Sequence, residues 1–342
     1  MPGHAFRRVL RLLVALVALP GTAQTAPAPA EPRAPATDGS HETQATTTES
    51  PPSWVAPTRI DRVGRILAPV YVNGSGPYAF VVDTGASRSA IAPRLVTALA
   101  LEDEPGATVT LRGITGTEQV PSIRVRRLEY GHVALDDQLL PVVRPGIFAN
   151  ADGILGVEGL EGSCLHADFL RQTISIDRGK CPRAKPGWLR VPAELRFGQL
   201  FTVQGRIGRT RVTIIVDTGA ERTLGNRALL EALDLQQHAE DPANRAQVMG
   251  ATSRSQPGSM IPAPEIRIAG IAVTRTQVTF GEFDVFGLWS LEDQPALLLG
   301  MDVVGAADAL MIDYRREELR LLPTGSAFAA RTGSRVPGSR LR

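Results

Sequence analysis

The sequence has few of the side chains that metal and nucleophilic chemistry requires. Its 342 residues include only two cysteines and five histidines. The histidines are scattered, and no two have the spacing of zinc ligands. No G-x-S-x-G segment is present, which argues against the nucleophile turn of many serine hydrolases. We therefore expect no metal and no cofactor.

Excess charge of either sign is also missing. The chain has 37 basic and 35 acidic residues, a formal net charge of +2. This balance gives no argument for a nucleic-acid partner. Lysine is nearly absent, since only Lys180 and Lys185 occur, and we interpret the resulting arginine bias as a property of the genome.

The N-terminus lacks an apolar run long enough to span a membrane. The run from Val9 to Leu19 is interrupted by Arg11 and is well short of the roughly 20 residues that a spanning helix needs. Arginines at its start and small residues around Ala23 predict a secretory signal peptide over residues 1–23, and hence a periplasmic or secreted protein. The alternative is that this segment stays uncleaved and anchors the protein to the membrane. We expect no other association with a membrane.

Large apolar side chains are almost absent from residues 24–57. Such a segment cannot bury enough surface to offset the entropy lost on ordering, so we expect a disordered linker. The polar residues 325–342 predict a flexible tail. The remaining chain is long enough for two domains, and its 33 glycines and 26 prolines favour β-structure rich in turns.

Two tetrapeptides carry the strongest chemical signal. Asp83-Thr84-Gly85-Ala86 follows the apolar run 78–82, and Asp217-Thr218-Gly219-Ala220 follows the apolar run 212–216. Each run predicts a buried strand, so each aspartate lies where the chain turns out of a sheet. Two carboxyl groups in the same context suggest a pair that shares one proton and one water.

The similarity between the two halves extends beyond these tetrapeptides. An offset of 134 residues aligns Asp83 with Asp217, and the leucines after each predict a short amphipathic helix in both halves. The later segments 152–156 and 296–300 also correspond. We infer a duplication, with one lobe over residues 58–182 and a second over residues 188–322.

The D-T-G-A tetrapeptides resemble the active-site turns of retropepsin-like aspartic proteases. Two copies in one chain resemble the single-chain, two-lobed arrangement of pepsins. The resemblance implies an all-β fold of two similar lobes related by pseudo-twofold symmetry, each with a short helix. It also implies an aspartic endopeptidase in which Asp83 and Asp217 activate a water to cut a peptide or protein substrate, and in which a monomer suffices.

The resemblance assigns supporting roles to the neighbouring residues. Thr84 and Thr218 would hydrogen-bond across the lobes, and Gly85 and Gly219 would let the two turns approach closely.

Pepsins carry a hydroxyl residue where this chain has Ala86 and Ala220. Without that hydrogen bond the carboxylates are stabilised less, so we expect raised pKa values and activity at mildly acidic to neutral pH.

Two glycine-containing segments are candidates for flaps, the hairpins that close over substrate in this family. The first contains Gly113, Ile114 and Gly116, and the second contains Gly250. Ordinary hairpins are the alternative. We interpret the apolar segment 281–294, with Trp289, as a segment that packs over the hydrophobic core rather than as a substrate pocket.

The two cysteines, Cys164 and Cys181, lie near the open end of a predicted hairpin over residues 167–177. In an exported protein we expect them to form a disulfide, and two free thiols are the alternative.

Two other functions remain open at this point. The chain could be a peptide-binding or scaffolding protein that kept the fold, since fold does not imply function. It could also be a processing protease with one dedicated substrate.

Overall fold

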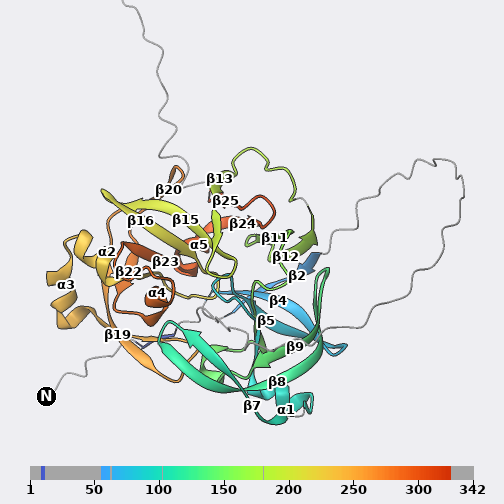
Figure 1. The fold of residues 1–342 in the computed structure, drawn as a ribbon. Coiled ribbons are helices and arrows are strands. Elements are labelled where there is room, and N and C mark those ends of the chain that lie inside the picture. Colours follow the sequence, from blue (N-terminus) through green and yellow to red (C-terminus); the bar gives the residue numbers. More distant parts are fainter. Residues whose placement is uncertain (1–8, 12–54, 62–63, 102, 180, 325–342) are drawn as a thin grey trace, which may run out of the picture.

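The computed structural model describes residues 9–11, 55–61, 64–101, 103–179 and 181–324. These residues are mostly β-strand with short helices, which confirms the predicted all-β class. Figure 1 shows a blue-to-green half and a yellow-to-red half, each built around its own strands. Most of the expected signal peptide, residues 12–54 and the expected tail lie outside the described residues.

The first lobe is built on one sheet in which β5 lies between β4 and β10. β5 and β10 run parallel, with Val82 opposite Leu155 at their ends. The strands are β3 (Arg59–Ile60), β4 (Ile66–Val72), β5 (Ser75–Val82), β6 (Ala90–Ile91), β7 (Asp103–Gly113), β8 (Gly116–Tyr130), β9 (Val133–Pro141) and β10 (Gly153–Leu155).

The second lobe repeats this arrangement. Its strands β16 and β23 run parallel with Val216 opposite Leu299, just as β5 and β10 do in the first lobe. The strands of its sheet are β1 (Val9–Arg11), β14 (Glu194–Arg196), β15 (Leu200–Ile207), β16 (Thr210–Val216), β17 (Leu224–Gly225), β18 (Arg245–Met249), β19 (Ser255–Pro262), β20 (Ile266–Ile268), β21 (Ile271–Val273), β22 (Gln277–Phe280) and β23 (Ala296–Leu299).

A third sheet joins the two lobes, which the sequence did not suggest. The predicted hairpin forms as β11 and β12, and β11 pairs with β24 of the second half. The strand order is β13 (Leu189–Pro192), β25 (Glu318–Pro323), β24 (Ala307–Asp313), β11 (Ser163–Asp168), β12 (Thr173–Arg178) and β2 (Val55–Pro57).

Two segments of the expected leader and linker have defined positions. β2 covers the last three residues of the expected disordered linker and pairs with β12, so the linker prediction was wrong for Val55–Pro57. The reason is that an edge strand of the shared sheet is available to pair with this short segment. β1, inside the expected signal peptide, pairs in parallel with β18.

The helices are short and fill the ends of the sheets. The predicted pair is confirmed as α1 and α2, and Asn226 caps α2 by accepting a hydrogen bond from the Leu229 N–H at 2.9 Å. The helices are α1 (Pro93–Ala98), α2 (Arg227–Ala232), α3 (Gln236–Glu240), α4 (Asp284–Leu288) and α5 (Met301–Val304), with 3₁₀ turns η1 (Pro145–Ile147) and η2 (Pro242–Asn244). Within the described residues, none of them has the length and apolar character needed to cross a membrane.

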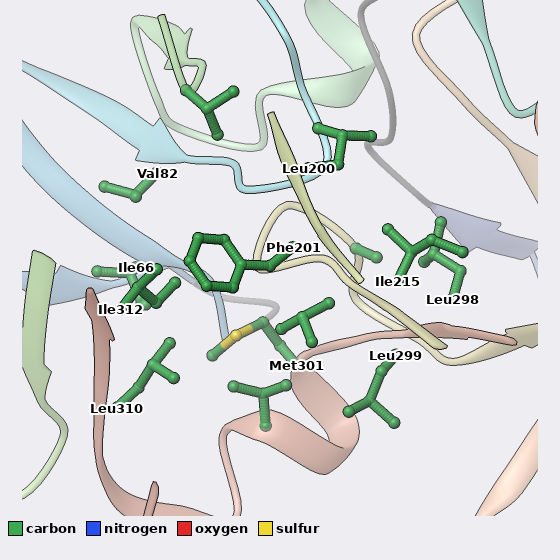
Figure 2. Close-up of a cluster of buried hydrophobic side chains, with 14 of the residues drawn as sticks. Ile66, Val82, Leu200, Phe201, Ile215, Leu298, Leu299, Met301, Leu310 and Ile312 are labelled. Atoms are coloured by element: carbon green, nitrogen blue, oxygen red, sulfur yellow. The ribbon is translucent and has the colours of Figure 1, made fainter. Parts of the chain in front are cut away.

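A continuous apolar core lies beneath the turns that carry the two aspartates. Figure 2 shows Phe201 of β15 among side chains of both lobes and of the shared sheet. Val82 and Ile215, which lead into the two aspartates, belong to this cluster and are fully buried. Close packing of this kind holds the ends of β5 and β16 in fixed positions.

The two cysteines form a disulfide that ties β11 to the chain leaving β12. Cys164 and Cys181 have Cα atoms 5.1 Å apart, and both are buried beside Met311 of β24. The bond therefore fastens the shared sheet to the segment that connects the lobes.

Replacing both cysteines by alanine should lower the free energy of unfolding by about 3 kcal/mol, because the unfolded chain regains the entropy of a loop of 17 residues. Urea unfolding of wild-type and double variant measures this difference. Reductant should lower the stability of wild-type protein and leave the variant unchanged. Equal midpoints for both proteins would contradict the assigned role of the disulfide.

Candidate active site

Asp83 and Asp217 each follow the inner parallel strand of their lobe. The N–H of Asp83 donates to the Leu155 carbonyl at 2.9 Å, and the N–H of Asp217 donates to the Leu299 carbonyl at 3.0 Å. These bonds continue the β5–β10 and β16–β23 ladders by one residue. Both aspartates are buried, with exposed fractions of 1% and 0%.

The structure brings the two carboxyl groups together. Each turn glycine lies against the opposite carboxyl group, and each carboxyl group affects the pKa of the other. A Cβ atom on Gly85 would lie 2.5 Å from the Asp217 carboxyl carbon, and one on Gly219 would collide with Asp83. Only glycine allows the turns to approach this closely.

Four hydrogen bonds made by two threonines hold the turns in register. The hydroxyl of Thr84 donates to the Val216 carbonyl at 2.8 Å and accepts from the Thr218 N–H at 3.0 Å. The hydroxyl of Thr218 donates to the Val82 carbonyl at 2.6 Å and accepts from the Thr84 N–H at 3.1 Å. Each threonine therefore fixes the strand that leads into the opposite aspartate.

Backbone groups inside each turn orient the carboxylates. The Gly85 N–H donates to Asp83 Oδ1 at 2.9 Å. The N–H groups of Gly219 and Ala220 donate to Asp217 Oδ1 at 2.8 and 3.0 Å. Asp217 Oδ2 is buried and has no hydrogen-bond partner within the described part of the chain.

Burial and mutual repulsion favour a protonated pair. Burial raises the pKa of Asp83 to about 6, although Asp217 and the Gly85 N–H oppose the shift. Burial, and then the charge of Asp83, raise the pKa of Asp217 well above its ordinary value. Two buried carboxyl groups in contact cannot both ionise at low cost, so they hold one proton between them near neutral pH.

One buried cation near the pair was not predicted. Arg65 is 3% exposed and forms an ion pair with Asp61 at 2.6 Å, and its charge lowers the pKa of Asp83. Its side chain also donates to the Ile147 carbonyl at 3.2 Å. Nothing in the local sequence distinguishes this arginine from the many on the surface.

A second layer of carboxyl groups supports both turns and was also missed. The Thr223 hydroxyl accepts from the Gly300 N–H at 3.2 Å and donates to Asp302 at 2.7 Å. In the first lobe the Ser89 hydroxyl accepts from the Gly156 N–H at 3.1 Å, and the Ser89 N–H donates to Glu158 at 2.5 Å.

The internal offset could have revealed this layer. Ser89 and Thr223 are 134 residues apart in the sequence, as the catalytic candidates are, and each acidic residue lies two positions after a corresponding glycine. Burial raises the pKa of Glu158 to about 7 and also raises the pKa of Asp302.

The two candidate flaps are hairpins whose tips meet. Ile114 and Thr115 form the tip between β7 and β8, and the Thr115 hydroxyl lies 2.7 Å from the Thr252 hydroxyl at the β18–β19 tip. Ile114 and Thr252 are both fully buried. A Cβ on Gly250 would lie 2.9 Å from the Thr115 hydroxyl, so glycine permits this contact.

The other expectations have mixed outcomes. The segment 281–294 contains α4, and Phe283, Phe286 and Trp289 are buried as core cover, but Trp289 also lines a cavity of about 590 Å³. Within the described ranges there is no cluster of three or more histidine, cysteine or acidic side chains that could hold a metal ion.

Comparison with known families agrees with this geometry. An aspartyl protease family model matches residues 68–158 and matches again over residues 203–303. The two matches cover more than half of the chain and each contains one aspartate of the pair, so the chain belongs to the aspartyl protease family, in its retropepsin-like form. No curated protein matches the chain.

Replacing Thr84 by valine should lower the free energy of unfolding by about 3 kcal/mol, because the buried Thr218 N–H and Val216 carbonyl both lose their partner. Urea unfolding measures the loss. Thr84→Ser keeps the hydroxyl and should cost no more than about 1 kcal/mol. Equal losses for the two variants would show that the hydrogen bonds do not hold the turns.

Replacing Glu158 by glutamine should flatten the dependence of stability on pH. The raised pKa means that the folded state holds a proton between the ordinary value of 4.5 and about 7, so stability falls as pH rises through that window. The part due to Glu158 is up to about 3 kcal/mol. Urea unfolding from pH 4.5 to 7.5 measures it.

The exposed Glu161, three residues further on, offers a matched control, and Glu161→Gln should keep the wild-type slope. A Glu158→Gln protein whose stability falls as steeply as that of wild type would contradict the assigned pKa.

Proposed function

We propose that this protein is an aspartic endopeptidase in which Asp83 and Asp217 activate a water for peptide hydrolysis. The observation that carries the proposal is the contact between two buried carboxyl groups at the boundary between the lobes. A pair that holds one proton contains both a base and an acid, which amide hydrolysis requires at the same time.

The water would lie between the two carboxyl groups and the scissile carbonyl. The ionised member of the pair takes a proton from the water as it attacks the carbonyl carbon, and the protonated member donates to the carbonyl oxygen. The aspartate that took the proton from water then donates it to the leaving amine nitrogen as the carbon–nitrogen bond breaks. The other aspartate takes a proton back from a hydroxyl of the tetrahedral intermediate as the new carboxyl group forms. Which aspartate starts as the base is not fixed, because the pair titrates as a unit.

The meeting hairpins support a role as flaps. Their tips contact each other and are buried, and the two aspartates are buried as well. Flaps that close over the pair would exclude bulk water and so strengthen electrostatic interactions inside the site. For substrate to enter, the contact between Thr115 and Thr252 must open. We propose that both hairpins act as lids, hinged by the glycines at residues 113, 116 and 250.

Export is part of the same proposal. The disulfide between Cys164 and Cys181 is of a kind that persists in oxidising compartments, which supports a periplasmic or secreted enzyme whose signal peptide is removed. One chain supplies both aspartates, so a monomer suffices.

Asp83→Asn and Asp217→Asn should each lower kcat/KM for peptide cleavage by about 10³-fold or more, because an amide cannot exchange the proton. A digest of a mixed peptide library, followed by mass spectrometry, measures the loss. The exposed Asp234 provides the control, and Asp234→Asn should retain wild-type activity. Cleavage at the wild-type rate by both active-site variants would refute the assignment.

The same digest separates the alternatives. Wild-type protein that binds peptides but cuts neither peptides nor intact proteins would be a binding or scaffolding protein. Wild-type protein that cleaves no peptide of the library but cleaves one protein in a total cell extract would be a processing protease with a dedicated substrate.

The pH–rate profile should peak between mildly acidic and neutral pH. The pKa of Asp83, raised to about 6, and the raised pKa of Asp217 place the singly protonated pair above the range of pepsin. Activity should fall at higher pH as the shared proton is lost. A profile with a single maximum near about pH 2 would contradict the raised pKa values.

A further inference from the structure

A cavity of about 590 Å³ is lined by residues of both lobes. Arg88, five residues after Asp83, and Arg112, next to the first flap tip, line it from the first lobe. Gln199 and Trp289 line it from the second lobe. A cavity shared by both lobes and adjoining a flap lies where an extended substrate would place a side chain.

The charge of this cavity is positive. Among the residues that the structure describes, neither Arg88 nor Arg112 has a carboxylate within ion-pair distance, and arginine stays charged at every working pH. The one acidic side chain in the lining is Glu158. Burial raises its pKa to about 7, although hydrogen bonds from Ser89 and the charge of Arg88 oppose the shift. At mildly acidic pH it is therefore mostly protonated and does not cancel both positive charges.

Three buried polar atoms of the lining lack a hydrogen-bond partner. They are Trp289 Nε1, Glu158 Oε2 and Gln199 Oε1. The indole N–H of Trp289 can only donate a hydrogen bond, and Glu158 can donate one when its carboxyl is protonated. The side-chain amide of Gln199 can rotate so that its NH₂ group takes the position of Oε1 and donates as well. A single anionic group in the cavity could therefore satisfy all three.

A cationic group would fit the cavity poorly. It would be repelled by Arg88 and Arg112 and would leave the Trp289 N–H unpaired, although it could interact with Glu158 and Gln199. Buried polar groups without partners cost about 1–3 kcal/mol each, so the donor-rich lining selects against a cation.

The corresponding position in the other half of the cleft differs. Arg222, which aligns with Arg88 at the offset of 134 residues, lies 3.7 Å from its neighbour Glu221. Where the second lobe has Glu221, the first lobe has Ser87. Arg88 therefore lacks the neighbouring carboxylate that its counterpart Arg222 has.

We propose that this cavity is a substrate subsite that binds an acidic side chain, aspartate or glutamate, of the bound peptide. Arg88 and Arg112 determine the specificity, and Trp289 donates the hydrogen bond that fixes the carboxylate. The inference rests on the proposed function, since it names a feature of the peptides that the cleft accepts.

Binding of uncleavable peptides tests the subsite without requiring catalysis. Eight-residue peptides with a reduced central amide would carry glutamate, glutamine or lysine at each position in turn, and fluorescence anisotropy near pH 5.5 would give Kd. At one position, glutamate should bind about tenfold tighter than glutamine, with lysine weakest, because hydrogen bonds to a charged group are stronger. Arg88→Gln and Arg112→Gln should each reduce that ratio to below about threefold.

Arg222→Gln is the matched control and should leave the ratio unchanged, since Arg222 faces its own acidic partner. Peptides that show no preference for glutamate at any position, or that fail to bind, would overturn the subsite. So would a preference that survives both variants. A glutamate preference in a protein that cleaves nothing would instead support the subsite and count against the proposed peptidase activity.

Discussion

The structure of the candidate active site depends on the close approach of two carboxyl groups, those of Asp83 and Asp217, that are both buried from solvent. Such a contact is unfavourable unless one proton is held between the acids, and unless the surrounding backbone prevents them from separating. The two threonine hydroxyls and the strand-end hydrogen bonds provide that restraint. The same contact raises the pKa values of both aspartates, which favours one protonated and one ionised carboxyl group near neutral pH.

Duplication explains how one chain can build this contact. Each half supplies one strand, one turn and one supporting hydroxyl–carboxyl pair, and the two halves meet about a pseudo-twofold axis. The shared sheet and the core around Phe201 join the halves into one unit, so the geometry of the pair does not rest on the turns alone. The halves differ beside the turns, where Ser87 of the first lobe corresponds to Glu221 of the second.

The sequence predicted what is set by local patterns. The turns at Asp83 and Asp217 follow apolar strands, and the leucines after each turn form α1 and α2, each from a signal within a few residues. The threonine contacts came from the family resemblance. These features were accessible because short segments and a motif suffice to define them.

The sequence did not predict what depends on pairing between distant segments. Neither the pairing of β11 with β24 nor the pairing of β2 with β12 is indicated by a pattern in the neighbouring residues. The contact between Thr115 and Thr252 joins residues 137 positions apart. In the sequence Glu158 resembles an ordinary charged residue, because its hydrogen bond with the Ser89 N–H joins residues 69 positions apart.

Carbon-13 NMR of the aspartate carboxyl groups tests directly whether Asp83 and Asp217 share one proton. In protein labelled at aspartate, the signals of Asp83 and Asp217, assigned by the two asparagine variants, would be followed across pH. We expect the two signals to titrate together and the pair still to hold one proton at about pH 6. Two independent titrations near about pH 4, the ordinary range for aspartate, would show that the acids do not share a proton.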